Sequence, residues 1–182
     1  MHRAPCLFLS VALSAVCVQA QQMSAPMTDA QKAAAIKSAT AAAPRDIGEH
    51  ATVIVPGDSG RMTVAREGTN GWTCIPDDRI HSGAMCADSA GMQWAQALMS
   101  HADRPPNTSP GVIYMLAGGT DVSATDPWAR PTGGRGIVSG PHYMVMWPFA
   151  AASGLSTTPK STGTWIMWSG TPYAHLMVNG VP

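Results

Sequence analysis

The hydrophobic positions follow different periods in different parts of the chain. In residues 30–43 almost every side chain is a small Ala, and Ile36 is the one large apolar residue. High helix propensity predicts a helix here, capped by Thr28 or Asp29 and ended by the following proline. Because so little apolar surface is available for burial, we expect residues 21–46 to form a loosely docked helical arm.

A second helix is predicted from Ser89 to about His101, with Asp88 as its N-cap. Its apolar side chains recur at spacings of three and four. They are Gly91, Met92, Trp94, Ala95, Leu98 and Met99. An apolar face this wide predicts packing against a sheet.

Short runs rich in Val, Ile, Thr and aromatic residues alternate with turn-forming segments rich in Gly, Pro and Ser. These runs predict strands at residues 51–55, 62–67, 72–75, 112–116, 143–147, 165–168 and 174–178. We expect the first three strands to form a meander. Together the elements predict a single α+β domain over residues 47–182, with one helix packed on a mainly antiparallel sheet.

The N-terminal segment has the pattern of a secretory signal peptide. His2 and Arg3 precede an apolar run over residues 6–18, and small residues lead to Ala20. We therefore expect residues 1–20 to be a signal peptide cleaved after Ala20, which places the protein in the periplasm or outside the cell. The apolar run is too short to span a bilayer, so no transmembrane segment is expected after cleavage.

Charge excludes some partners. The 182 residues carry 11 Lys plus Arg and 11 Asp plus Glu, for a formal net charge of zero, and like charges form no run. Nucleic acids and anionic membranes are recognised by concentrated positive charge. We therefore expect neither kind of partner.

Two cysteines, Cys74 and Cys86, lie beyond the expected cleavage site. Export to an oxidising compartment favours a disulfide between them. The alternative is a metal site that adds His81 to the two thiolates. Such a site lacks an evident fourth ligand and the paired short spacings typical of tetrahedral zinc sites, so we favour the disulfide.

Two further segments have the composition of known motifs. Residues 57–60 read GDSG, as around the nucleophile of trypsin-like proteases, but Ser59 comes too early in the chain and Arg61 follows it. Residues 121–126 place oxygen-bearing side chains at alternate positions, but they lack the Gly and the distal Glu of an EF-hand loop. We interpret the first as a polar turn and the second as a loop stabilised by its own side-chain hydrogen bonds.

The strongest chemical signal is a His and a Met two residues apart in each of two predicted strands. Strand alternation places these side chains on one face of each strand. The residues are His142, Met144, Met146, His175 and Met177. Thioether and imidazole ligands suit monovalent copper, so adjacent strands would create a Cu(I) site, which an indole such as Trp147 or Trp165 could cover. The alternative is that the methionines fill the core and the histidines are buried and hydrogen-bonded.

Non-enzymatic binding or a stress-related role in the cell envelope is our functional expectation. The enzymatic alternative is a small periplasmic hydrolase or lyase that uses His142 and His175 with a carboxylate such as Asp121. Imidazoles close to each other or to an acid in an open pocket would favour catalysis or metal binding, and burial under side chains would count against both. An interaction module would instead expose an apolar patch, which we expect to contain some of Trp128, Trp147 and Trp165.

Four sequence segments resemble a family of exported bacterial proteins of unknown function. They are residues 67–74 (EGTNGWTC), 85–86 (MC), 139–142 (SGPH) and 170–178 (GTPYAHLMV). The resemblance covers the chain from about Ile47 onward and omits the Ala-rich arm. It implies export and carries no activity, cofactor or catalytic residue with it.

Overall fold

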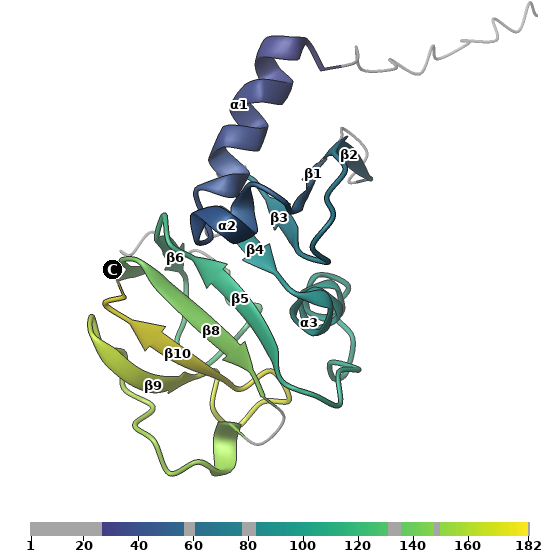
Figure 1. Ribbon diagram of the computed structural model, residues 1–182. Coiled ribbons are helices and arrows are strands. Elements are labelled where there is room, and N and C mark those ends of the chain that lie inside the picture. The colour runs from purple at the N-terminus through teal and green to yellow at the C-terminus, as the bar shows by residue number, and fades with distance from the viewer. Residues whose placement is uncertain (1–26, 57–60, 78–82, 131–135, 148–149, 182) are drawn as a thin grey trace, which may run out of the picture.

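The computed structural model describes residues 27–56, 61–77, 83–130, 136–147 and 150–181 (Figure 1). Several expectations fall outside this part of the chain. They concern the signal peptide of residues 1–20, the beginning of the arm, the GDSG turn with Ser59, and His81. These stay predictions from the sequence.

An eight-stranded sheet forms the centre of the fold, in the order β2-β1-β3-β4-β5-β8-β10-β9. Its strands are β1 (Thr52–Pro56), β2 (Met62–Arg66), β3 (Thr73–Ile75), β4 (Met85–Ala87), β5 (Gly111–Met115), β8 (His142–Met146), β9 (Gly163–Met167) and β10 (His175–Asn179). A separate two-stranded sheet pairs β6 (Gly119–Asp121) with β7 (Ile137–Ser139). All neighbouring strands are antiparallel except β1 and β3. The expected α+β class with a mainly antiparallel sheet is confirmed.

The expected meander of the first three strands is wrong. Strand β3 lies on the other side of β1 from β2 and runs parallel to β1, with Val53 opposite Cys74. The connection from β2 folds back over the start of β1, where the Gly68 N–H donates to Thr52 Oγ1 at 3.1 Å. A Cβ at Gly68 would lie 2.1 Å from the Thr52 nitrogen, so only glycine permits this close crossing.

Helix α1 (Asp29–Thr40) begins at the N-cap Thr28, which forms a capping box with Gln31. Its N-terminal half is exposed, but Ala39 and Ala42 are fully buried. The Leu116 N–H donates to the Ala42 carbonyl at 2.9 Å and ties this end to the end of β5. The expected loose docking is therefore wrong at the C-terminal end of the helix, because small alanines let its backbone approach the sheet closely.

Two further helices follow α1 in the chain. Helix α2 (Arg45–Gly48) is a single turn, and α3 (Ser89–Met99) crosses near β4 and β5 (Figure 1). Asp88 caps α3, as expected, by accepting the Gly91 N–H at 2.7 Å and the Val112 N–H of β5 at 3.0 Å. The same carboxylate thus fixes the start of α3 to the sheet. A short 3₁₀ turn (Ala150–Ala152) follows β8.

The Cys74–Cys86 disulfide joins directly opposite residues of β3 and β4, with 4.0 Å between the Cα atoms. The favoured pairing is therefore confirmed. Because both sulfurs are engaged, they do not supply the two thiolates that the alternative metal site with His81 requires. Within the described ranges no helix is both long enough and apolar enough to cross a bilayer.

Candidate functional site

Strands β8 and β10 lie side by side, as a shared site requires. Their antiparallel register sets Met144 opposite Met177 and His142 opposite Asn179. Opposite residues of paired strands project to the same face. The expected His and Met side chains therefore share one face, which contributes to the main core beneath Trp94 of α3.

The register nevertheless separates the two imidazoles. Leu176 pairs with Val145, so the next residues along, His175 and Met146, are also neighbours. His142 is four positions from Met146, which is about 13 Å along an extended strand. The backbone register therefore places the two histidines toward opposite ends of this face, with His142 opposite Asn179 and His175 beside Met146. The five residues predicted from the sequence extend along the length of the β8–β10 pair and remain a prediction as a metal site.

His175 has the denser group of thioethers around it. Met146 is its neighbour on β8, Met167 lies directly opposite on β9, and Met177 is two residues along its own strand. All four side chains are at most 1% exposed. Met167 was not among the residues predicted from the sequence, because its place beside His175 depends on the pairing of β9 with β10.

Each buried histidine has one bonded and one unpaired ring nitrogen. Nδ1 of His175 lies 3.0 Å from the Tyr173 carbonyl, and Nδ1 of His142 lies 2.8 Å from the Gly140 carbonyl. A carbonyl oxygen only accepts, so Nδ1 carries the hydrogen in both rings and Nε2 carries a lone pair. Both Nε2 atoms are buried without a hydrogen-bond partner among the described residues.

Two indoles enclose His175. The ring centroids of Trp94 and Trp168 lie 5.2 Å and 5.0 Å from the imidazole in edge-on geometry, and the two indoles stack on each other at 5.9 Å. Trp168 has a φ of 52°, which is costly for an aromatic residue. Its indole N–H donates to the Ser123 carbonyl at 2.9 Å and holds the ring in place. Of the two indoles suggested from the sequence, Trp165 lies on the same face opposite Met177, whereas Trp147 is 38% exposed.

Burial controls the protonation of this region. It lowers the pKa of His175 to about 4 and also lowers the pKa of His142, so both rings are neutral at physiological pH. It raises the pKa of the Asp121 carboxyl to about 6. In the described part of the chain neither imidazole has a carboxylate within ion-pair distance. Among the described residues, the hydrolase or lyase alternative therefore has no carboxylate paired with either imidazole, and both imidazoles are buried.

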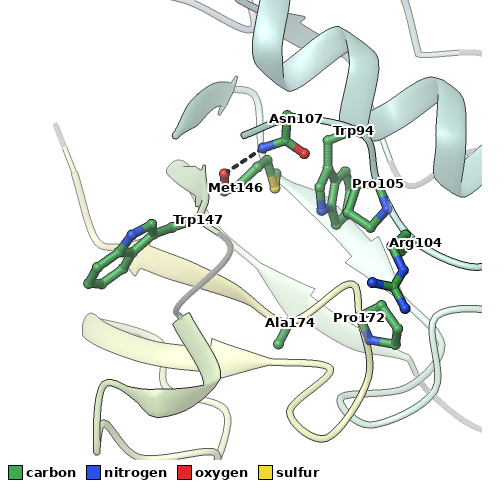
Figure 2. A pocket seen from close by; sticks show the side chains of 8 residues that line it. All are labelled: Trp94, Arg104, Pro105, Asn107, Met146, Trp147, Pro172 and Ala174. Atoms are coloured by element: carbon green, nitrogen blue, oxygen red, sulfur yellow. Dashed lines mark hydrogen bonds between the residues drawn. The ribbon is translucent and has the colours of Figure 1, made fainter. Parts of the chain in front are cut away.

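A cavity of about 310 Å³ lies at the end of the sheet where β8 finishes. Figure 2 shows the eight residues that line it: Trp94, Arg104, Pro105, Asn107, Met146, Trp147, Pro172 and Ala174. Met146 and Trp94 belong both to this cavity and to the surroundings of His175. The cavity therefore adjoins the buried His and Met layer.

The other motifs have structural explanations. Ser123 Oγ accepts the N–H groups of Thr125 and Asp126 at 3.1 Å and 3.0 Å, as expected for a loop that bonds its own backbone. The described ranges contain no cluster of three or more His, Cys, Asp or Glu side chains able to hold a metal ion. Trp165 is fully buried and so cannot contribute to an exposed interaction patch.

Comparison with family models, with curated proteins and with solved structures finds no match to this chain. The resemblance to exported bacterial proteins therefore stays a prediction from the sequence.

Proposed function

We propose that this protein is an exported, non-enzymatic binding protein for Cu(I). The ion is held by Nε2 of His175 and the thioether sulfurs of Met146, Met167 and Met177. The observation that carries the proposal is the buried Nε2 lone pair of His175, which has no hydrogen-bond partner among the described residues. Export rests on the sequence of residues 1–20, and the disulfide is compatible with an oxidising compartment.

An unpaired buried acceptor costs about 1–3 kcal/mol, so it calls for an explanation. Metal-binding histidines commonly donate one ring N–H to a carbonyl, which fixes the tautomer and directs the other nitrogen to the metal. His175 has this arrangement, with Nδ1 fixed by the Tyr173 carbonyl. Its Nε2 is therefore in the protonation state that a metal ligand needs.

The donor set selects the ion. Thioether sulfurs are soft ligands that favour Cu(I) over zinc, magnesium or calcium. All four proposed ligands are neutral, and no carboxylate of the described residues pairs with His175 to offset a second positive charge. Burying a divalent ion among neutral groups would be more costly than burying a monovalent one.

Burial and access are compatible in this arrangement. Burial of both histidines counts against catalysis and, by the criterion set from the sequence, against an open metal site, so the proposal requires an ion shielded from solvent. It is compatible with a shielded ion, because a hydrophobic shell keeps water from the metal. Met146 lines the cavity beside β8 and is also the neighbour of His175 across the strand pair.

A competition titration tests the proposal. The mature exported protein, with its disulfide intact, is titrated without oxygen with Cu(I) against a chromogenic chelator, using a non-thiol reductant. We expect one ion per chain with a Kd below about 1 μM. Because His175 stays neutral down to about pH 4, the affinity should be nearly constant between pH 5 and pH 8. Trp94 and Trp168 report binding through their fluorescence.

Matched variants identify the site. His175→Phe should abolish tight binding, and Met146→Leu, Met167→Leu and Met177→Leu should each weaken it by about tenfold or more, since Leu keeps the volume and removes the sulfur. Met62→Leu on β2 and His142→Phe are the controls and should retain binding. Circular dichroism verifies that each variant is folded. Binding weaker than micromolar, or binding unchanged by His175→Phe, would overturn the proposal.

A further inference from the structure

We propose that the interior of the protein has a binding site for one water molecule, formed by His142 of β8, Asn179 of β10 and Trp165 of β9. All three residues are at most 5% exposed. Each has a side-chain polar atom that is buried without a hydrogen-bond partner among the described residues. None of the four ligands proposed for Cu(I) takes part, so the inference goes beyond the proposed function.

The pairing of the strands places these three residues near one another on one face of the sheet. Asn179 lies directly opposite His142 on one side and directly opposite Gly163 on the other. Directly opposite residues have Cβ atoms about 5 Å apart. Trp165 is two residues beyond Gly163, on the same face, and is therefore the diagonal neighbour of Asn179. Diagonal neighbours are about 7–8 Å apart, which an aromatic side chain can span.

His142 supplies a buried acceptor. Its Nδ1 donates to the Gly140 carbonyl at 2.8 Å, so Nε2 carries the lone pair. Burial lowers the pKa of this ring, which keeps Nε2 unprotonated at neutral pH. The imidazole therefore requires a hydrogen-bond donor on its Nε2 side.

Asn179 supplies a second acceptor beside the first. Its Nδ2 donates to the Lys160 carbonyl at 2.6 Å, and a flipped amide would set its oxygen against that carbonyl. Oδ1 is therefore the atom left unpaired. Because two acceptors cannot bond to each other, His142 and Asn179 do not satisfy one another directly.

Water has the donors and the acceptor that these three atoms require. One O–H donates to Nε2 of His142, the other donates to Oδ1 of Asn179, and the water oxygen accepts the Nε1–H of Trp165. Buried waters typically make about three hydrogen bonds to polar groups that are otherwise unsatisfied. A metal cation or an ammonium ion would suit the two acceptors, but neither can accept the N–H of Trp165. The three atoms together therefore select a neutral water molecule.

NMR of the mature, metal-free protein with its disulfide intact tests the inference. We expect a cross-peak between water and the indole Hε1 of Trp165, with opposite signs in NOE and ROE spectra, as a long-lived bound water gives and proton exchange does not. Trp168 is the internal comparison and should give no such cross-peak, because its indole N–H already donates to the Ser123 carbonyl at 2.9 Å. A high-resolution crystal structure should place one water oxygen within hydrogen-bond distance of all three atoms.

A matched pair of variants identifies the site. Asn179→Leu replaces the amide by an apolar group of the same branched shape and should abolish the cross-peak at Trp165. Asn107→Leu is the control, because Asn107 is also buried with an unpaired Oδ1 but bonds to the Met146 carbonyl, at the other end of β8 from His142. This variant should keep the cross-peak.

Two outcomes would overturn the inference. One is the lack of a bound-water cross-peak at Trp165 in the natural protein, and the other is its persistence in folded Asn179→Leu. Because the first outcome is measured on the natural protein, the test does not depend on the folding of either variant.

Discussion

At the scale of single residues, only one of the two ring nitrogens of His175 is hydrogen-bonded among the described residues. Its Nδ1 is bonded to the Tyr173 carbonyl, its Nε2 is unpaired, and two indoles shield it from water. Because a charged ring is poorly solvated in this environment, the neutral form is strongly favoured. The carbonyl partner is only two residues away in the chain. The two shielding indoles come from distant segments, Trp94 from α3 and Trp168 from the end of β9.

This burial makes stability depend on pH. The folded-state pKa of His175, about 4, is below the unfolded value of 6.5, so its stabilising contribution is present above pH 6.5 and is lost as the pH falls through 4. The full loss is about 3 kcal/mol. The Phe in His175→Phe does not titrate. Between pH 7 and pH 4 we therefore expect the free energy of unfolding of the natural chain to fall by up to about 3 kcal/mol more than that of the variant. Urea denaturation at several pH values measures the difference.

Asp121 titrates in the same range with the opposite sign. Its folded-state pKa, about 6, is above the ordinary value of 3.8, so its contribution is present below pH 3.8 and is lost as the pH rises through 6. The comparison is therefore made in an Asp121→Asn background as well. The prediction would be contradicted if the free energy of unfolding of His175→Phe had the same pH dependence as that of the chain with His175, both with Asp121 and with Asp121→Asn.

At the scale of elements, Asp88 joins a helix to a strand. One carboxylate oxygen accepts the Gly91 N–H in the first turn of α3, and the other accepts the Val112 N–H of β5. The helix itself follows from local signals, namely the cap and the spacing of its apolar residues. The link from Asp88 to β5 does not follow from local signals, because Val112 is 24 residues away in the chain.

The Asp88→Ala substitution should be more costly than loss of an ordinary cap. We expect a decrease of about 2 kcal/mol in the free energy of unfolding, because an N-cap and a buried strand donor lose their acceptor together. Thr28→Ala removes only the exposed cap of α1 and should cost about 0.5–1 kcal/mol. Asp88→Asn, which keeps one acceptor oxygen, should fall between them. An effect of Asp88→Ala no larger than that of Thr28→Ala would show that the contact with β5 contributes nothing.

At the scale of the whole molecule, the disulfide lies on the face of the sheet opposite to the one that carries His175. It joins β3 to β4 in the core that also buries Ala39 and Val53, whereas Trp94, Met146 and Met177 belong to a second core. The bond is therefore expected to affect global stability and to leave the ligands around His175 in place.

Loss of the bond should lower the free energy of unfolding by about 3 kcal/mol, because the unfolded chain regains the freedom of the closed loop. For a chain of this size the melting temperature should fall by roughly 6–12 °C. Dithiothreitol should cause this shift in the natural protein and none in Cys74→Ala/Cys86→Ala, which controls for the reductant. An unchanged melting temperature after complete reduction would contradict the prediction.

The sequence by itself determined the features that depend on neighbouring residues. Helix starts at Thr28 and Asp88 follow from capping chemistry, and the shared face of His142, Met144 and Met146 follows from strand alternation. The disulfide follows from having two cysteines beyond the expected cleavage site. Each of these signals is contained within a few residues or in a simple count.

Only the tertiary structure decided which strands are neighbours and in which register. It placed β3 beside β1, separated His142 from His175, and brought Met167 next to His175. It also formed the cavity, in which Asn107 and Arg104 from one loop meet Met146 from β8. Register between distant strands is selected by burial of the whole face and by close backbone crossings such as that at Gly68, and these energies depend on residues far apart in the chain.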